Sequence, residues 1–158
     1  MEPRIVELNE IQITGIQVLA SPESGEFGKT WPKLFERCNE IDPLDGLKIW
    51  YGVQSYDKEL MTQGIWKYTA GTESKAGIKT PIGMETLHLP KSKYAVFEYH
   101  GAISPKLGET FGYIYREWLP NSEYNPAGMF DFERYDERFL GPEHPDSILE
   151  IYIPIIEK

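Results

Sequence analysis

The sequence predicts an α+β fold in which a βαββ unit occurs twice. The order strand, helix, strand, strand is found in the first half of the chain and again in the second. In both expected helices apolar residues recur at i, i+4 and i+7, and the two sets coincide at an offset of 80 residues. They are Trp31, Phe35 and Cys38 in the first helix and Phe111, Tyr115 and Trp118 in the second. Neither copy could bury its apolar faces alone, so we expect the two copies to share one core.

The first copy begins with "IQITGIQVLA", where apolar and polar residues alternate as in a strand. A turn-rich stretch then leads into a helix expected near residues 25–40, with Thr30 as its cap and Pro32 in its first turn. Two strands separated by a polar turn are expected at 47–56 and 61–73.

The second copy repeats this order, starting with the strand "KYAVFEYHGAI". Its helix is expected near residues 105–119, with Ser104 as cap, Pro105 at the first position and Pro120 as the stop. The segments "MFDFERYDERF" and "SILEIYIPII" then supply the last two strands.

The length of the chain limits the number of domains. A chain of 158 residues is long enough for one well-stocked core and short for two ordinary domains. We therefore expect residues 1–158 to form a single domain, with repeat halves at about 1–75 and 88–158 that residues 72–92 join.

Composition excludes several classes of function. With 25 acidic and 16 basic residues the formal charge is −9, which argues against direct nucleic-acid binding because such binding rests on Lys and Arg. Cys38 is the only cysteine, so no internal disulfide forms, and no apolar run is long enough to span a membrane. His88, His100 and His144 lack metal-ligand spacing. We expect a cytoplasmic protein with no cofactor, no metal and no membrane contact.

Acidic residues inside two strand-like segments are the main candidates for function. Glu133 precedes Tyr135 by two positions, and the pair of Glu150 and Tyr152 repeats this spacing. If these pairs and their equivalents in the first copy share a face, one surface collects Glu133, Tyr135, Glu150, Tyr152, Trp66, Tyr68 and Trp50. Gly52 falls near the position equivalent to Glu133, where a missing side chain would leave room.

Such a surface has two interpretations. Aromatic walls with carboxylates at the floor attract organic cations, and flat apolar walls suit drug-sized ligands. Alternatively, these residues lie on the solvent side of a one-sided sheet, where cross-strand Glu and Tyr are common.

Five motifs resemble the GyrI-like small-molecule-binding domain, also called the AraC-type effector-binding domain. They are "IWYGV", "SKYAVFEYHG", "YREWLPNSEY", "DFERYDERF" and "LEIYIPI". The resemblance implies a pseudo-twofold pair of βαββ units, an antiparallel sheet with two main helices and a central ligand pocket. It also implies that an acidic residue in an aromatic pocket recognises organic cations. That role fits Glu133 best and Glu150 next, with Tyr135 and Tyr152 as walls, and we place Phe111 and Tyr115 at the same site.

Three functions stay open from the sequence. The first is a stand-alone binding protein for cationic or amphipathic organic compounds, linked to transcriptional regulation or drug sequestration. The second is a hydrolase of reactive small molecules, for which Glu133 and Tyr135 are the catalytic candidates because a buried carboxyl can move protons. The third is an inhibitor that binds a protein partner. The chain contains no recognisable helix-turn-helix, so the resemblance carries ligand binding without DNA binding.

Overall fold

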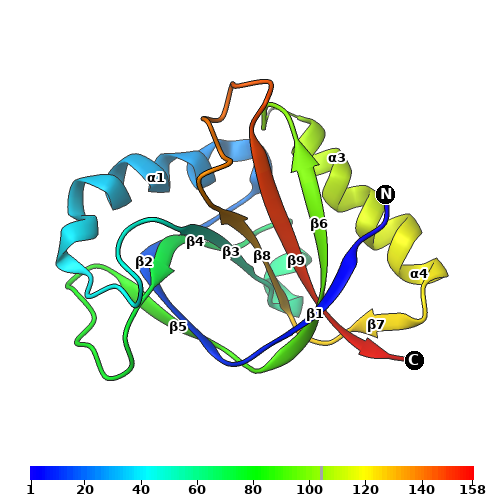
Figure 1. Cartoon of the computed structure of the whole chain (residues 1–158), viewed down its shortest axis with the longest axis horizontal. Helices are drawn as coiled ribbons and strands as arrows, with labels where there is room; N and C mark the ends of the chain where they lie inside the picture. Colours follow the sequence, from blue (N-terminus) through cyan, green and yellow to red (C-terminus); the bar gives the residue numbers. More distant parts are fainter. Residues whose placement is uncertain (104) are drawn as a thin grey trace.

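A single curved sheet runs through both halves of the chain in the computed structural model, which describes residues 1–103 and 105–158. Nine strands of the described chain pair antiparallel in the order β1-β6-β9-β8-β3-β4-β2-β5, and β7 pairs with β9. The strands are β1 (Arg4–Leu8), β2 (Ile11–Ala20), β3 (Trp50–Ser55), β4 (Trp66–Glu73), β5 (Glu85–Leu89), β6 (Ser92–His100), β7 (Tyr124–Pro126), β8 (Phe130–Tyr135) and β9 (Ile148–Glu157). Two main helical segments lie on the same side of this sheet (Figure 1).

The predicted duplication is confirmed by the strand order. The first copy is β2-α1-β3-β4 and the second is β6-α3-β8-β9, and within each copy the third strand lies between the other two. The copies meet where β3 pairs with β8, which gives the sheet its pseudo-twofold symmetry. The expected join contains a strand of its own, β5, which pairs with β2, while β1 pairs with β6. Each βαββ unit is therefore completed by the strand that precedes the other unit.

Helix α1 (Glu26–Arg37) begins earlier than the cap expected at Thr30. Gly25 adopts a positive φ of 78° just before the first turn, a conformation that glycine adopts without steric cost. Pro32 consequently lies inside the helix, where its ring removes one backbone donor. The short 3₁₀ segment η2 (Cys38–Glu40) extends the helical region, so the expected range of 25–40 agrees with the structure.

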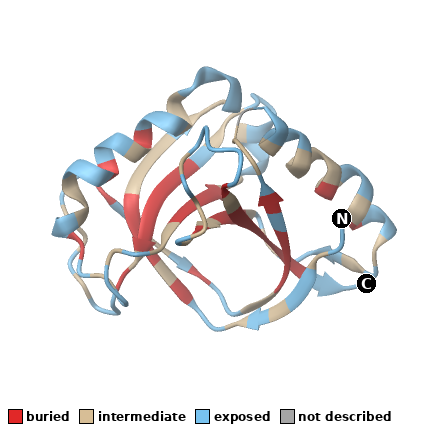
Figure 2. Ribbon diagram, turned by 45° about the horizontal axis from the view of Figure 1, so that its top comes forward, coloured by how far each residue is buried: buried red, intermediate tan, exposed pale blue. Residues whose placement is uncertain are grey.

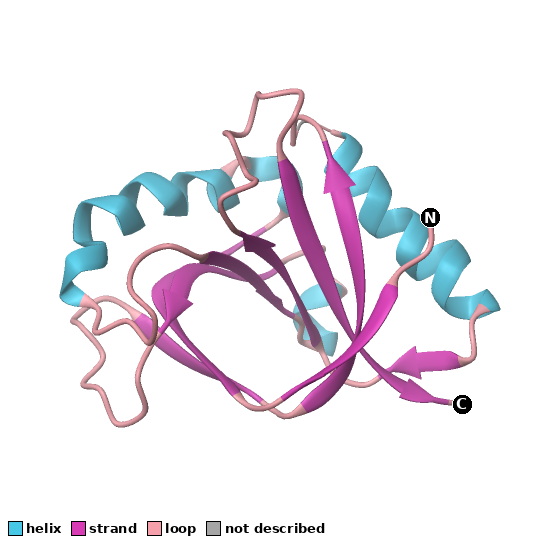
Figure 3. Ribbon diagram, viewed as in Figure 1, coloured by secondary structure: helices cyan, strands magenta, loops and turns pink. Residues whose placement is uncertain are grey.

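The second helical region is interrupted by a π-helical turn. It consists of α3 (Lys106–Tyr113), the π segment η3 (Ile114–Trp118) and α4 (Leu119–Asn121). Pro120 lies inside α4 and the helix ends one residue later, close to the expected stop. The cap expected at Ser104 lies outside the described residues. Figure 3 shows this region and α1 above the strands, and a one-turn helix, α2 (Lys58–Met61), in place of the expected polar turn.

Each face of the sheet carries its own apolar layer. Under the helices, strand residues such as Ile151 and Tyr68 pack against α1, α3 and η3, and we call this side the helix face. On the opposite side, which we call the far face, residues such as Val53 and Tyr152 form a separate cluster. Figure 2 shows buried residues along the central strands and exposed residues on the outer sides of the helices. No described helix is long and apolar enough to cross a membrane.

Candidate functional site

The alternation of side chains along each strand divides the predicted site residues between the two faces. On β8, Glu133 pairs directly with Ile151 of β9, which faces the helices, whereas Arg134 pairs with Glu150. Directly paired residues project to the same face of a sheet. Glu133 therefore lies on the helix face and Glu150 on the far face. The expectation that both carboxylates share one cavity is wrong.

Two carboxylates are buried side by side on the helix face. Asp131 and Glu133 are two positions apart on β8 and share a face, and their exposed fractions are 0% and 4%. The side-chain amide of Gln54, on the neighbouring strand β3, donates to both: its Nε2 lies 2.9 Å from Oδ1 of Asp131 and 3.4 Å from Oε2 of Glu133. Among the described residues no Lys, Arg or His forms an ion pair with either carboxylate. This pair is the centre of the candidate site.

Two tyrosine hydroxyls complete the hydrogen bonds of Asp131. Tyr56 and Tyr115 each donate to its Oδ2 at 2.7 Å. Tyr115 belongs to the π-helical turn η3, so that turn delivers its hydroxyl to the sheet. Trp66 donates its indole N–H to Oε1 of Gln54 at 3.0 Å, which fixes the amide with its nitrogen toward the carboxylates.

Glu133 receives its hydrogen bonds from the aromatic wall. The hydroxyl of Tyr135 donates to its Oε1 at 2.7 Å and that of Tyr68 at 3.3 Å. Trp31 of α1 in turn donates its indole N–H to the Tyr68 hydroxyl at 3.2 Å. Oε2 has only the long contact from Gln54, so this oxygen retains acceptor capacity for a ligand.

Burial without a counter-charge shifts both carboxyl groups toward their neutral forms. Loss of solvation raises the pKa of Asp131 to about 6, although hydrogen bonds from Tyr115, Tyr56 and Gln54 oppose the shift. Loss of solvation also raises the pKa of Glu133 to about 7, and the nearby charge of Asp131 adds to the effect. The site therefore carries one to two uncompensated negative charges at neutral pH.

Aromatic rings surround the carboxylate pair on the helix face. Phe27 of α1 stacks on Tyr68 with centroids 4.9 Å apart, and Trp31 meets Tyr135 edge-on at 5.2 Å. Trp50 contacts Phe35 edge-on at 5.1 Å. The predicted apolar stripe of the first helix is only partly right, since Phe35 is 53% exposed at the edge of this aromatic group and Leu34 is the fully buried residue.

Gly52 lies beside Glu133, where its missing side chain leaves room as the sequence predicted. It pairs directly with Glu133 across β3 and β8. A Cβ atom at this position would collide with the Tyr68 hydroxyl and lie 2.9 Å from Oε1 of Glu133. The missing side chain therefore makes room for the glutamate and its tyrosine partner.

Of the predicted ligand-binding residues, six lie at or near the carboxylate pair on the helix face: Glu133, Tyr135, Trp66, Tyr68, Trp50 and Tyr115. Phe111, one helical turn before Tyr115, packs against the apolar cluster beneath α3. Sequence reasoning missed Asp131, Gln54, Tyr56 and Trp31. Asp131 and Gln54 could have been found from alternation, because they have the same parity as Glu133 and Gly52 on their strands.

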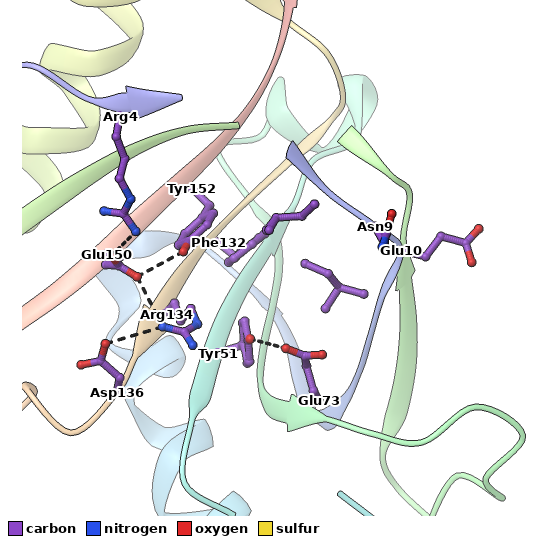
Figure 4. A pocket seen from close by; sticks show the side chains of 12 residues that line it. Arg4, Asn9, Glu10, Tyr51, Glu73, Phe132, Arg134, Asp136, Glu150 and Tyr152 are labelled. Carbon is purple, nitrogen blue, oxygen red and sulfur yellow. Dashed lines mark hydrogen bonds and ion pairs between the residues drawn. The ribbon is translucent and has the colours of Figure 1, made fainter. Parts of the chain in front are cut away.

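Glu150 and Tyr152 line a hollow on the far face instead (Figure 4). This hollow has a volume of about 430 Å³ and is floored by Phe132 and Tyr152, whose rings stack at 4.7 Å. Glu150 is held there by three guanidinium groups: Arg4 at 2.5 Å, Arg138 at 3.3 Å and Arg134 at 3.4 Å. Its charge is compensated within the protein, unlike that of Glu133.

The chemistry available at the carboxylate pair is binding of a cation or transfer of a proton. A carboxyl group with a pKa near 7 can exchange a proton with a bound molecule, so the hydrolase interpretation stays a prediction. Among the described residues, no group of three or more His, Cys, Asp or Glu side chains is arranged to hold a metal ion.

Comparison with known proteins gives a family and a set of related folds. A family model described as "Cass2: Integron-associated effector binding protein" matches residues 4–155. The chain is 34% identical over 155 residues to the transcriptional regulator BrlR of Pseudomonas aeruginosa, covering 98% of this chain and 56% of the regulator. The chain thus spans little more than half the length of that relative.

Several solved structures share the fold, and two of them are informative here. SAV2435, solved bound to tetraphenylphosphonium, superposes with a TM-score of 0.69 at 18% identity, covering 99% of this chain and 94% of that chain. EcmrR, solved as a complex with DNA, superposes with a TM-score of 0.73 at 17% identity, covering 99% of this chain and 58% of that chain. The absence of direct nucleic-acid binding therefore stays a prediction for this chain.

Proposed function

Because the chain belongs to the family of integron-associated effector-binding proteins, relatives of the GyrI-like domains, we propose that it binds amphipathic organic cations on the helix face of its sheet. The ligand would lie against Glu133, with Tyr68, Tyr135 and Trp50 as walls. SAV2435, which shares the fold, was solved with a lipophilic cation bound. The match to a transcriptional regulator supports a role for such binding in regulation.

One observation carries the proposal: within the described part of the chain, only neutral groups donate hydrogen bonds to the two buried carboxylates. Every donor to Asp131 and Glu133 is a tyrosine hydroxyl or an amide. A buried charge without a partner is costly, so a ligand that brings the opposite charge to it removes that cost and gains affinity. Aromatic faces add cation–π attraction of about 0.5–2 kcal/mol each, depending on desolvation. A lipophilic cation satisfies both features at once.

The test is calorimetric titration with tetraphenylphosphonium and with triphenylphosphine oxide, a neutral molecule that keeps three phenyl rings. Replacing Glu133 by Gln should weaken binding of the cation by about 1–3 kcal/mol, the scale for losing a charged partner in a desolvated site. Binding of the neutral molecule should change much less. Glu137→Gln is the matched control, because Glu137 is exposed on the same segment and its loss removes the same charge. Equal losses for both ligands in Glu133→Gln would refute the proposal.

A further inference from the structure

We propose that the helix-face site prefers ligands with two cationic centres over ligands with one, because Asp131 supplies a second buried negative charge beside Glu133. This inference rests on the proposed function and extends it to a ligand class. It assigns Asp131, a residue that sequence reasoning missed, as a determinant of specificity.

The geometry places the two charges within reach of one ligand. Asp131 and Glu133 are two positions apart on β8, on the same face, and one nitrogen of Gln54 lies 2.9 Å from the first and 3.4 Å from the second. The two negative charges therefore lie close together, so a dication bound against Glu133 would interact with both. Both carboxylates are nearly inaccessible to water, so their attraction for a cation is weakly screened.

Among the residues that the structure describes, no group at the site supplies the missing positive charge. The titratable groups that face the pair are four tyrosines: Tyr56, Tyr68, Tyr115 and Tyr135. Burial raises the pKa of each hydroxyl far above its ordinary value, so all four stay neutral. The remaining polar neighbours are Gln54, Trp31 and Trp66, which do not titrate.

Charge balance then separates the two ligand classes. A ligand with one cationic centre compensates one carboxylate, so the other must bind a proton or stay buried and uncompensated. A ligand with two cationic centres compensates both. Because protons are scarce at high pH, the preference for the dication should grow as pH rises and shrink as it falls.

The two carboxylates contribute in different ways. Glu133 keeps an oxygen, Oε2, whose only contact is the long one from Gln54, so it can meet the ligand directly. Asp131 already accepts two tyrosine hydroxyls on Oδ2 and the Gln54 amide on Oδ1. We infer that Asp131 acts mainly through its charge while its tyrosine partners stay in place.

The experiment uses two probes of nearly equal shape that differ by one charge: 1-methyl-4-phenylpyridinium, a monocation, and N,N′-dimethyl-4,4′-bipyridinium, a dication. Their affinities for the full chain are measured by calorimetry at pH 8.5 and pH 5.5. High salt is used throughout, because it screens the exposed charges of a chain whose formal net charge is −9. The variants are Asp131→Asn and the exposed control Glu137→Gln.

For the wild type we expect the dication to bind about tenfold more tightly than the monocation, or better, at pH 8.5, and within about threefold at pH 5.5. Asp131→Asn should reduce the ratio at pH 8.5 to within about threefold and leave the monocation bound. Glu137→Gln should leave the ratio unchanged. The wild-type pH series decides the question by itself if Asp131→Asn does not fold.

A wild-type ratio near one at both pH values, or a ratio that Asp131→Asn does not lower, would overturn the inference while the proposed function stands. If neither probe nor tetraphenylphosphonium binds the wild type, the proposed function fails and the inference fails with it.

Discussion

Two buried glutamates on neighbouring strands should respond to the same substitution with opposite signs. Glu133 on β8 and Glu150 on β9 are 4% and 3% exposed. The described donors to Glu133 are all neutral groups, whereas three arginines surround Glu150. We predict that at pH 8 Glu133→Gln raises the free energy of unfolding and Glu150→Gln lowers it.

The magnitude for Glu133 follows from its pKa. Burial raises the pKa of the carboxyl from 4.5 to about 7, which corresponds to about 3 kcal/mol of destabilisation above pH 7. The sign follows from proton binding: as pH rises from about 4.5 to 7, the unfolded chain loses its proton first, so the free energy of unfolding falls. Gln keeps one oxygen for Tyr135 and Tyr68 but places an amide near Gln54, which offsets part of the gain.

We therefore expect a net gain of about 1–3 kcal/mol at pH 8, or about 3–8 °C in Tm for a chain of this size, and almost none at pH 4.5. Glu150→Gln should lose about 1–3 kcal/mol at pH 8, because three arginines then lose their shared partner. The assay is thermal unfolding of both variants at pH 4.5 and pH 8. The reasoning is refuted if Glu133→Gln is destabilised at pH 8 like Glu150→Gln, or if its gain is the same at both pH values.

Two further substitutions probe the packing of the site. Gly52→Ala should destabilise the fold by about 1–3 kcal/mol and abolish cation binding, because the added methyl group collides with Tyr68 and crowds Glu133. Chemical unfolding measures the loss of stability and calorimetry measures the loss of binding. A variant that binds the cation as tightly as the wild type would contradict the geometry. Tyr115→Phe removes one of three hydrogen bonds to ionised Asp131. The free energy of unfolding should therefore fall by about 1–2 kcal/mol at pH 8, and by less at pH 4.5, where the carboxyl is protonated. Equal losses at both pH values would show that the effect does not come from the charge of Asp131.

The repeat and the composition of the site could be predicted because they depend on patterns within single segments. The order of elements within each copy and the two-residue spacing that puts Glu133 and Tyr135 on one face are local properties of the chain. The face of Glu150 could not be predicted in the same way. Alternation states which residues of one strand share a face, but only the register between β8 and β9 states which faces coincide. The twin Glu-x-Tyr spacing therefore suggested a shared surface that the pairing does not form.

The tyrosine hydrogen bonds to Asp131 depend on backbone details that cannot be read from the sequence. Tyr115 reaches the sheet from a π-helical turn, and a π turn shifts the helical phase in a way that an i, i+4, i+7 pattern does not contain. Helix α1 begins at a glycine with positive φ rather than at the residue with the better capping side chain. Neither feature can be read from the apolar spacing of the helices.

The exchange of outer strands between the halves bears on how such a fold could arise and how it must unfold. Strand β1 completes the edge beside β6, and β5 completes the edge beside β2. A chain with one βαββ unit and its leading strand would keep an unpaired edge, and a second copy with the same sequence could cover it by symmetric exchange. Gene fusion of that dimer would preserve every pairing. In the fused chain neither half can melt without exposing an edge of the other, so both should unfold in one cooperative step.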